Sequence, residues 1–327
     1  MNRIQITAIL LLLSQATRLV ADDVASETVL PQLQTMTVTS SLDGSDEPVR
    51  YWAPESANET LTPLLVFLHS WSSDVRQDNS KWHREAVARN WVYLHPNFRG
   101  ANQTPKATGS KFARQDILDA MNVIRKQYRI DPDRVYLAGV SGGGHMAMLM
   151  AGHHPDQFTA VSAWVGISDL ADWYQFHCRN GEPQKYAKMI LKSLGQPPGS
   201  DAETDADYRD RSPVFHLQHA ARLPVDLWAG VNDGHAGSVP VSHTLKAYNV
   251  LAAAQGAPTV TDVEMEQLWT DRKLKLPTDE DTVTDATLGR EIRLRRTAGA
   301  SRVTIFEGGH ESIPAAACEW LANQHRR

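Results

Sequence analysis

The chain has 327 residues, of which 42% are hydrophobic and 22% charged, and its formal net charge is −5. A chain of this length can bury a large core, and its 20 glycines and 17 prolines are too ordinary for a collagen-like or broadly disordered protein. The small negative charge provides no basic surface for nucleic acid or for an anionic membrane. Two cysteines, Cys178 and Cys318, are too few for a disulfide scaffold or a thiolate metal cluster. The classes that remain are globular enzymes and binding domains.

Residues 1–21 have the pattern of a secretory signal peptide. Arg3 precedes the apolar run at 6–13, which is too short to cross a bilayer, and Leu19-Val20-Ala21 stands before two aspartates, where cleavage would occur although Leu19 is larger than a cleavage site prefers. We therefore expect a secreted or periplasmic protein with no membrane attachment after cleavage; a short amphipathic start or an uncleaved anchor is the alternative. Export would also permit a disulfide between Cys178 and Cys318, and two buried thiols are an equally open alternative.

Extended segments follow in chain order. The first two flank the Asp-Gly turn at 42–45, so an antiparallel hairpin over 35–52 should open the fold. Short, continuous apolar runs then recur, and each is typical of a strand buried on both faces of a parallel sheet. These predicted strands lie at 64–69, 91–95, 134–138, 158–165, 225–229 and 302–306.

Helical periodicity alternates with these strands. One apolar helix face carries Ala113, Ile117, Met121, Ile124 and Tyr128. The segments 146–151 and 241–254 have a similar pattern. Strands that alternate with helices are joined by βαβ crossovers, so we predict an α/β fold with a mostly parallel central sheet and helices on both faces.

Two longer segments interrupt this alternation. Residues 171–222 exceed the length of a crossover and contain a Pro-Pro-Gly stretch and an acidic run, so we expect a cap inserted beside the carboxyl edge of the sheet. Residues 257–299 form a second, polar and loop-rich insertion that should end in a hairpin with arms at 291–294 and 303–306. Neither insertion has the character of an independent domain, so residues 22–327 are predicted to be a single domain.

The strongest chemical signal follows the strand at 134–138. The chain reads Gly-Val-Ser-Gly-Gly at 139–143, and a helix begins at once. Gly-x-Ser-x-Gly between a strand and a helix lifts a serine hydroxyl above the sheet, while the glycines let the chain turn tightly. Ser141 is therefore the predicted nucleophile, and the backbone N–H of Gly142 points to where an oxyanion would develop. The alternative is a glycine-rich turn that binds phosphate or only packs.

A serine nucleophile needs an imidazole to take its proton and a carboxylate to orient that imidazole. His310 follows the last predicted strand in a Glu-Gly-Gly-His-Glu turn, and Asp233 follows the strand at 225–229. Both positions lie at the sheet edge that carries Ser141. The order serine, aspartate, histidine along the chain is the one expected for this class of site.

Other residues could take the role of the acid or the base. Asp169, just past a buried strand, could reach the same histidine, although capping the next helix is its simpler role. His145, His235 and His243 compete with His310 for the base. His145 lies within the helix that follows the nucleophile, where packing is the simpler explanation.

The loop after the first core strand should supply a second oxyanion donor, and the backbone N–H of Trp71 is its natural candidate. Ser141 would attack an acyl carbonyl while Trp71 and Gly142 hold the oxyanion, with neither a metal nor another cofactor required. Two histidine pairs, at 153–154 and 216–219, lack a carboxylate or cysteine at ligand spacing, which speaks against metal binding.

These motifs resemble the α/β-hydrolase superfamily, and they are nearest to its prolyl-oligopeptidase-like and secreted esterase branches. The resemblance is carried by Leu-His-Ser-Trp at 68–71, Asn-Phe-Arg-Gly at 97–100, Gly-Val-Ser-Gly-Gly-Gly-His at 139–145, and the stretch from 212 to 311. It implies the α/β-hydrolase fold and an acyl-enzyme mechanism, and it is specific for the superfamily and the site rather than for a substrate.

The sequence departs from this pattern in two places. Ser70 stands in the middle of the oxyanion loop, where family members commonly have His-Gly-x. Prolyl oligopeptidases also carry a β-propeller before the catalytic domain, whereas only residues 22–63 lie between the predicted signal peptide and the first core strand. This difference favours an esterase over a peptidase.

Aromatic residues near the predicted cap indicate a substrate class. Trp71, Trp164, Trp173, Tyr174 and Phe176 could form a wall that suits a sugar face or a phenolic acyl group, with Trp173 and Tyr174 as substrate contacts, although burial in the core is the simpler role for Trp164. We therefore expect a carboxylic-ester hydrolase whose substrate is a small or polysaccharide-linked ester, such as an acetyl or feruloyl ester of plant polysaccharide. A serine peptidase of the same fold is the alternative. A non-catalytic binding protein on a hydrolase scaffold is a third, lesser possibility.

Overall fold

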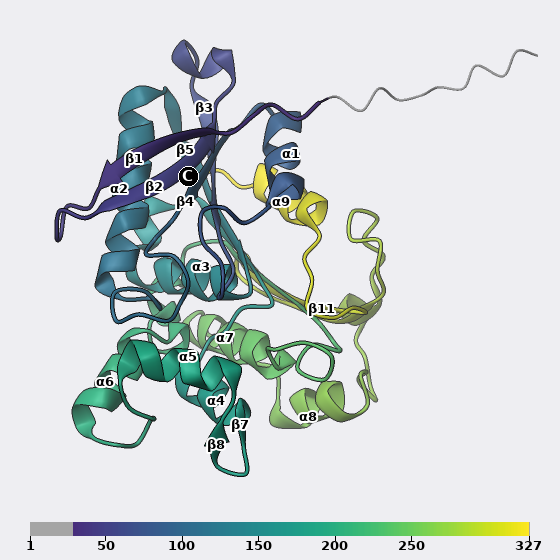
Figure 1. Ribbon diagram of the computed structural model, residues 1–327. Helices are drawn as coiled ribbons and strands as arrows, with labels where there is room; N and C mark the ends of the chain where they lie inside the picture. The colour runs from purple at the N-terminus through teal and green to yellow at the C-terminus, as the bar shows by residue number, and fades with distance from the viewer. Residues whose placement is uncertain (1–28, 327) are drawn as a thin grey trace, which may run out of the picture. The chain divides into compact units, whose positions relative to one another are not determined.

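A nine-stranded sheet forms the centre of the computed structural model, which describes residues 29–326 (Figure 1). The strand order across the sheet is β1-β2-β4-β3-β5-β6-β9-β11-β10. Its strands are β1 (Gln34–Thr39), β2 (Asp46–Trp52), β3 (Thr62–Leu68), β4 (Val92–Pro96), β5 (Ile130–Val140), β6 (Ala160–Trp164), β9 (Val225–Gly230), β10 (Ile292–Ala298) and β11 (Ser301–Phe306). The predicted signal peptide at 1–21 lies outside the described residues.

The middle of the sheet is parallel, and its edges are antiparallel. Strands β3, β4, β5, β6, β9 and β11 pair in parallel, whereas β1 pairs with β2, β2 with β4, and β10 with β11 in the antiparallel sense. Every residue of β3 is buried, as its unbroken apolar sequence predicts for a strand covered on both faces. The predicted opening hairpin and the mostly parallel α/β sheet are confirmed.

Helices cover both faces of the sheet. They are α1 (Ser80–Ala88), α2 (Lys111–Gln127), α3 (Gly142–His153), α7 (Val241–Ala254) and α9 (Pro314–Ala322). Figure 1 shows α1 and α9 together on one side, with α2, α3 and α7 on the other. Helix α2 illustrates why these segments are helical: the Ser110 hydroxyl caps its first turn by accepting from Ala113 N at 3.3 Å, and its apolar stripe faces the sheet.

The segment predicted as a cap lies between β6 and β9. It contains α4 (Leu170–Phe176), the short pair β7 (Cys178–Arg179) and β8 (Glu182–Pro183), α5 (Lys185–Leu194) and α6 (Ala202–Asp210), which gather below the sheet in Figure 1. The segment has a hydrophobic cluster of its own, which we call the cap cluster. Its buried members are Trp71, Ile167, Leu170, Trp173, Tyr174, Ala187, Met189, Ile190, Tyr208 and Val239.

The second insertion has more regular structure than its polar sequence indicates. Helix α8 (Asp262–Thr270) begins with a capping box, in which Thr261 and Glu264 bond to each other's backbone N–H groups. Strand β10 pairs with β11 along the edge of the main sheet, so the predicted hairpin exists but is part of that sheet. The prediction of a loop-rich segment at 257–299 is therefore wrong at Asp262–Thr270, which is helical.

Both cysteines are free thiols. Cys318 is buried in α9, where burial raises the pKa of its thiol well above the usual range, and Cys178 is half-buried in β7. Of the two alternatives for this pair, the structure has the unpaired one. Among residues 29–326, no helix has both the length and the apolar character needed to cross a bilayer.

Buried histidines make the stability of this fold depend on pH. Burial lowers the pKa of His95 and His243 to about 3 and that of His145 to about 4, from the ordinary value of 6.5. Between pH 6.5 and about 4 the unfolded chain therefore binds protons that the folded chain does not, so the free energy of unfolding falls as the pH drops through this range. We expect each of these histidines to remove about 2 kcal/mol at pH 5, measured by urea denaturation at pH 5 and pH 7.

A variant isolates this effect. His243→Gln removes one titrating group, so its free energy of unfolding should fall less between pH 7 and pH 5 than that of the wild type. Equal losses in the two proteins would contradict the assignment of this pH dependence to buried neutral histidines.

Candidate active site

Ser141 occupies a strained turn between β5 and α3. Its backbone has φ 60° and ψ −118°, a left-handed φ that few non-glycine residues adopt. The serine N–H donates to the carbonyl of Trp164 at 2.9 Å, and its own carbonyl accepts from His145 N at 2.8 Å, which fixes the turn from both sides. This backbone geometry is what the Gly-x-Ser-x-Gly motif predicts, whereas the serine itself is only 8% exposed.

The glycines of this motif are required by close backbone contacts. A Cβ added at Gly139 would lie 2.1 Å from the carbonyl oxygen of Gly143, and one added at Gly143 would lie 2.1 Å from that of Leu68. Strands β3 and β5 pair Leu68 with Gly139, so the loops that follow these two strands start side by side. This strand pairing therefore places the turn of Ser141 against the loop that carries Trp71.

Asp233 and His310 are hydrogen-bonded to each other. The Nδ1 atom of His310 lies 2.7 Å from Oδ2 of Asp233. The other carboxylate oxygen of the fully buried aspartate accepts from the backbone N–H groups of Gly234 at 2.9 Å and Val239 at 3.1 Å. Because a carboxylate accepts, Nδ1 of His310 carries the proton, and Nε2 is left with a lone pair that can take another.

The loops that bear these two residues are joined by their backbones. Strands β9 and β11 are parallel neighbours, and beyond them Val231 N donates to Phe306 O at 2.8 Å and Asn232 N to Gly308 O at 3.0 Å. The structure thus places Ser141, Asp233 and His310 after β5, β9 and β11, at the carboxyl edge of the parallel sheet, and bonds the last two directly.

Gly237, which the sequence did not single out, leaves room for this pair. A Cβ added there would lie 2.1 Å from Oδ1 of Asp233 and 2.8 Å from Cβ of His310. We expect Gly237→Ala to displace the carboxylate and to lower kcat by about a hundredfold in an ester-hydrolysis assay. Gly309→Ala is the matched control, because a Cβ at that neighbouring glycine meets nothing within 4 Å. Similar activities in the two variants would show that the Asp–His geometry tolerates the added methyl group.

The loop after β3 brings Trp71 against the start of α3. A Cβ added at Gly142 would lie 2.3 Å from the backbone nitrogen of Trp71, so the two predicted oxyanion donors are neighbours. Gly142 is the first residue of α3, where the backbone N–H has no partner within the helix. Ser70, the departure from the family pattern, donates from its hydroxyl to Val140 O at 3.3 Å and so ties this loop to the turn of Ser141.

The alternative acid and bases have other partners. Asp169 caps α4, accepting from the backbone N–H groups of Ala171 at 2.9 Å and Asp172 at 3.2 Å, as its simpler role predicts. His145 and His243 are buried, and His235 lies beside the carbonyl of Trp269. Among the histidines within residues 29–326, His310 is the one that hydrogen-bonds to the Asp233 side chain.

The predicted aromatic wall is mostly interior. Trp164 stacks on Trp228 in the main core, with ring centroids 4.6 Å apart. Trp173 and Tyr174 were expected to contact substrate, but they are only 1% and 6% exposed because both pack into the cap cluster. Phe176 is the exposed member, at 38%.

Trp269 is an aromatic residue near the site that the sequence did not reveal. It lies on α8. The centroid of its ring is 3.7 Å from that of His235 and 6.5 Å from that of Phe176. A Cβ added at Gly234 would lie 2.9 Å from the indole, which places Trp269 against the loop of Asp233. The capping box at the start of α8 was the sequence signal that could have identified this helix.

One cluster of metal-type ligands forms in space. His153, Asp210 and His216 offer ligand atoms that all lie within 4.8 Å of one another, so the argument that no carboxylate accompanies these histidines is wrong. Both terminal nitrogens of Arg114 donate to the Asp210 carboxylate at 3.1 Å, and one lies 3.2 Å from Nε2 of His153. A guanidinium thus already pairs with this carboxylate and contacts one of the two histidines.

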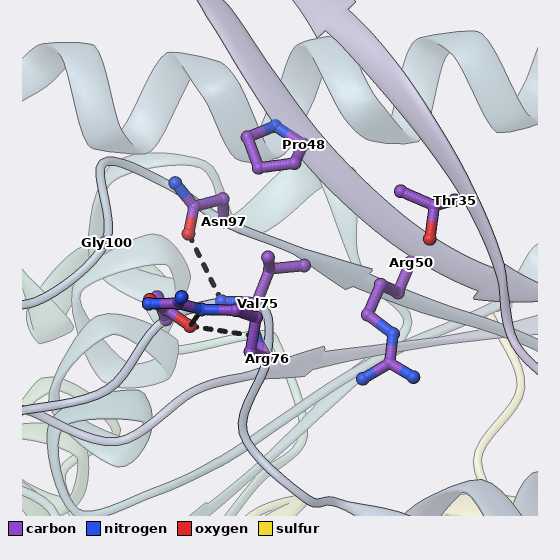
Figure 2. A pocket seen from close by; sticks show the side chains of 8 residues that line it. Thr35, Pro48, Arg50, Val75, Arg76, Asn97 and Gly100 are labelled. Atoms are coloured by element: carbon purple, nitrogen blue, oxygen red, sulfur yellow. Dashed lines mark hydrogen bonds and ion pairs between the residues drawn. The ribbon is translucent and has the colours of Figure 1, made fainter.

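A hollow of about 600 Å³ lies beside the first hairpin (Figure 2), and neither Asp233 nor His310 lines it. It is lined by Thr35, Pro48, Arg50, Asp74, Val75, Arg76, Asn97 and Gly100. The side-chain oxygen of Asn97 accepts from Val75 N at 3.2 Å, and the backbone carbonyl of Asn97 lies 2.5 Å from Nε2 of His69. The rim of this hollow is therefore continuous with the start of the loop that carries Trp71.

A strained serine turn, an Asp–His pair and two backbone donors at the edge of a parallel sheet define an α/β hydrolase. The chain belongs to the prolyl oligopeptidase family: residues 79–268, more than half of its length, match the family's model. The family and the matched relatives support a serine hydrolase.

Its relatives include peptidases and esterases. It is 28% identical over 150 residues to the uncharacterized peptidase YtmA of Bacillus subtilis, covering 45% of this chain and 54% of that protein. It is 31% identical over 103 residues to the bifunctional acetylxylan esterase/xylanase XynS20E of Neocallimastix patriciarum, covering 31% and 15%. The acylaminoacyl peptidase of Pyrococcus horikoshii superposes with a TM-score of 0.57 at 19% identity, covering 88% of this chain and 39% of that one. The chain spans about half or less of the length of these proteins.

Proposed function

We propose that this protein is a secreted carboxylic-ester hydrolase that acts through Ser141, His310 and Asp233. The observation that carries the proposal is the 2.7 Å bond between His310 and a fully buried Asp233, at the sheet edge where Ser141 stands in a nucleophile turn. A buried carboxylate in this position holds the imidazole in one tautomer and stabilises its protonated form.

The mechanism follows from these positions. Ser141 Oγ attacks the ester carbonyl as His310 Nε2 takes its proton, and the backbone N–H groups of Trp71 and Gly142 donate to the oxyanion. The tetrahedral intermediate expels the alcohol, which receives the proton from His310, and the acyl group remains on the serine. Water then attacks the acyl-enzyme with His310 again as the base, which releases the acid and restores the serine.

Ester substrates are favoured over peptides by the character of the relatives and of the exposed aromatics. The chain is 31% identical to the named acetylxylan esterase/xylanase and 32% identical to a poly(3-hydroxybutyrate) depolymerase of Ralstonia pickettii, over 103 and 142 residues. Phe176 and Trp269 offer aromatic surface beside the loop of Asp233. Such rings stack on sugars and on phenolic acids, so acetyl or feruloyl esters of plant polysaccharide are the proposed substrates.

A substrate panel tests this assignment. Purified protein is assayed on p-nitrophenyl acetate, acetylated xylan, a feruloyl ester, and aminoacyl and prolyl p-nitroanilides. We expect hydrolysis of the esters at higher kcat/KM than of any amide. Amides cleaved faster than esters would instead support the peptidase activity that the family's name denotes.

The proposed export rests on residues 1–21. The protein expressed from its full sequence should appear outside the cytoplasm and begin near residue 22, as read by mass spectrometry of the intact chain. An intact Met1 on the extracellular protein would contradict cleavage there.

A further inference from the structure

Two buried polar atoms beside the oxyanion loop have no hydrogen-bond partner among residues 29–326. They are Nε1 of the Trp71 indole and Nδ1 of His145. Trp71 is 2% exposed and His145 is completely buried, so neither atom reaches bulk water. An unsatisfied polar atom in the interior destabilises the fold, which makes two such atoms in one place a feature that needs a partner.

The two atoms are chemically complementary. Nε2 of His145 lies 2.7 Å from the carbonyl oxygen of Arg211, which can only accept, so Nε2 carries the proton. Burial lowers the pKa of His145 to about 4, so the ring is neutral near pH 7 and Nδ1 has a free lone pair. The indole N–H of Trp71 can only donate. One group therefore offers what the other lacks.

The two rings are neighbours. The two rings meet edge-on with centroids 5.8 Å apart, and the structure has no direct bond between them. A water molecule that accepts from the indole and donates to the imidazole satisfies both atoms at once, as buried waters commonly do for polar groups that cannot reach each other.

The link joins two parts of the proposed catalytic machinery. His145 is one helical turn after Ser141, to whose carbonyl its own backbone N–H donates. Trp71 is already held at its carbonyl, which accepts from the backbone and side-chain nitrogens of Asn102 at 2.8 and 3.2 Å, and its ring packs on Trp173. Fixing the indole to the helix of Ser141 fixes the remaining freedom of the loop whose N–H faces the oxyanion.

We propose that His145 is a positioning residue, which holds Trp71 through one buried water so that the Trp71 backbone N–H stays beside Gly142. The catalytic part of this proposal rests on the proposed function, whereas the link itself does not. A donor that is fixed in advance stabilises the transition state more than the bound substrate, so loss of the link should lower kcat and leave KM nearly unchanged.

Matched substitutions separate the two nitrogens of His145. His145→Gln places an amide nitrogen near the position of Nε2, which keeps the bond to Arg211, but it loses the acceptor at Nδ1. His145→Asn returns a polar atom near Nδ1 and should recover part of kcat. Trp71→Phe removes the indole N–H and keeps the backbone N–H.

A double-mutant cycle measures the coupling. We expect His145→Gln and Trp71→Phe each to lower kcat on p-nitrophenyl acetate by about tenfold, and the double variant to lose about tenfold as well, since both changes break one link. A loss of about a hundredfold in the double variant would mean that the two residues act independently and would overturn the proposal. His243→Gln, another buried neutral histidine, should show no coupling to Trp71→Phe.

A spectroscopic measurement judges the link without any activity. The indole N–H resonance of Trp71, assigned by its loss in Trp71→Phe, should shift and exchange faster in His145→Gln than in wild type or His243→Gln. An unmoved resonance would overturn the link even in an active enzyme. If the wild type hydrolyses none of the esters but the Trp71 resonance still shifts in His145→Gln, the proposed function is wrong and the link between Trp71 and His145 is supported.

Discussion

Ser141→Ala is expected to lower kcat for ester hydrolysis by about 10⁴-fold or more, because no acyl-enzyme can form without the hydroxyl. The fold should survive, since serine and alanine experience the same strain at φ 60° and the bonds that hold this turn are made by backbone atoms. The measurement is the hydrolysis of p-nitrophenyl acetate at saturating substrate, with circular dichroism of each variant to verify folding.

Labelling by a fluorophosphonate probe provides a second readout for this variant. The wild type and Ser200→Ala, a change at an exposed cap serine, should both be labelled, and Ser141→Ala should not. Full labelling or full activity in Ser141→Ala would remove the nucleophile from the mechanism. It would leave the non-catalytic binding protein as the better account of the scaffold.

Asp233→Asn is expected to lower kcat by about 10⁴-fold with little change in fold. An amide has nearly the same shape as the carboxylate, but with its oxygen kept toward Gly234 and Val239 it presents an N–H to His310. The imidazole must then accept at Nδ1, which puts its proton on Nε2 and removes the lone pair that receives the serine proton. Rates measured across pH 6–9 give the effect on kcat.

Asp169→Asn is the matched control for this change. Asp169 is the alternative acid by its place in the sequence, but its carboxylate caps α4, and asparagine caps helices equally well. Its kcat should therefore stay close to that of the wild type. A large loss in Asp169→Asn together with a small one in Asp233→Asn would exchange the roles of the two aspartates.

The sequence was most informative where one local pattern determines one conformation. Continuous apolar runs predicted the buried strands, and the glycines around Ser141 predicted its turn because each contact there is between neighbouring backbones. The pairing of Asp233 with His310 was also foreseeable, since parallel strands deliver the loops that follow them to one edge.

What the sequence could not provide depends on three-dimensional packing. The positions of aromatic residues along the chain do not determine whether a side chain packs into a cluster or faces solvent. Trp173 was therefore expected at the surface, but it is buried. Asp210 lies beside His153 and His216 because the chain of the cap returns to the end of α3. Trp269 lies against the loop of Asp233 because residues 262–270 form a helix. Gly237 matters through a contact with the side chain of Asp233, four residues away.

The cap cluster has a consequence for how this protein loses activity on heating. Trp71 packs there with residues of the cap rather than in the main core, and the cap cluster has far fewer members than that core. Small cooperative units open at lower free energy than the whole domain. We therefore expect partial melting of the cap to release the loop that carries the proposed oxyanion donor, so that activity is lost while the nine-stranded sheet is still intact.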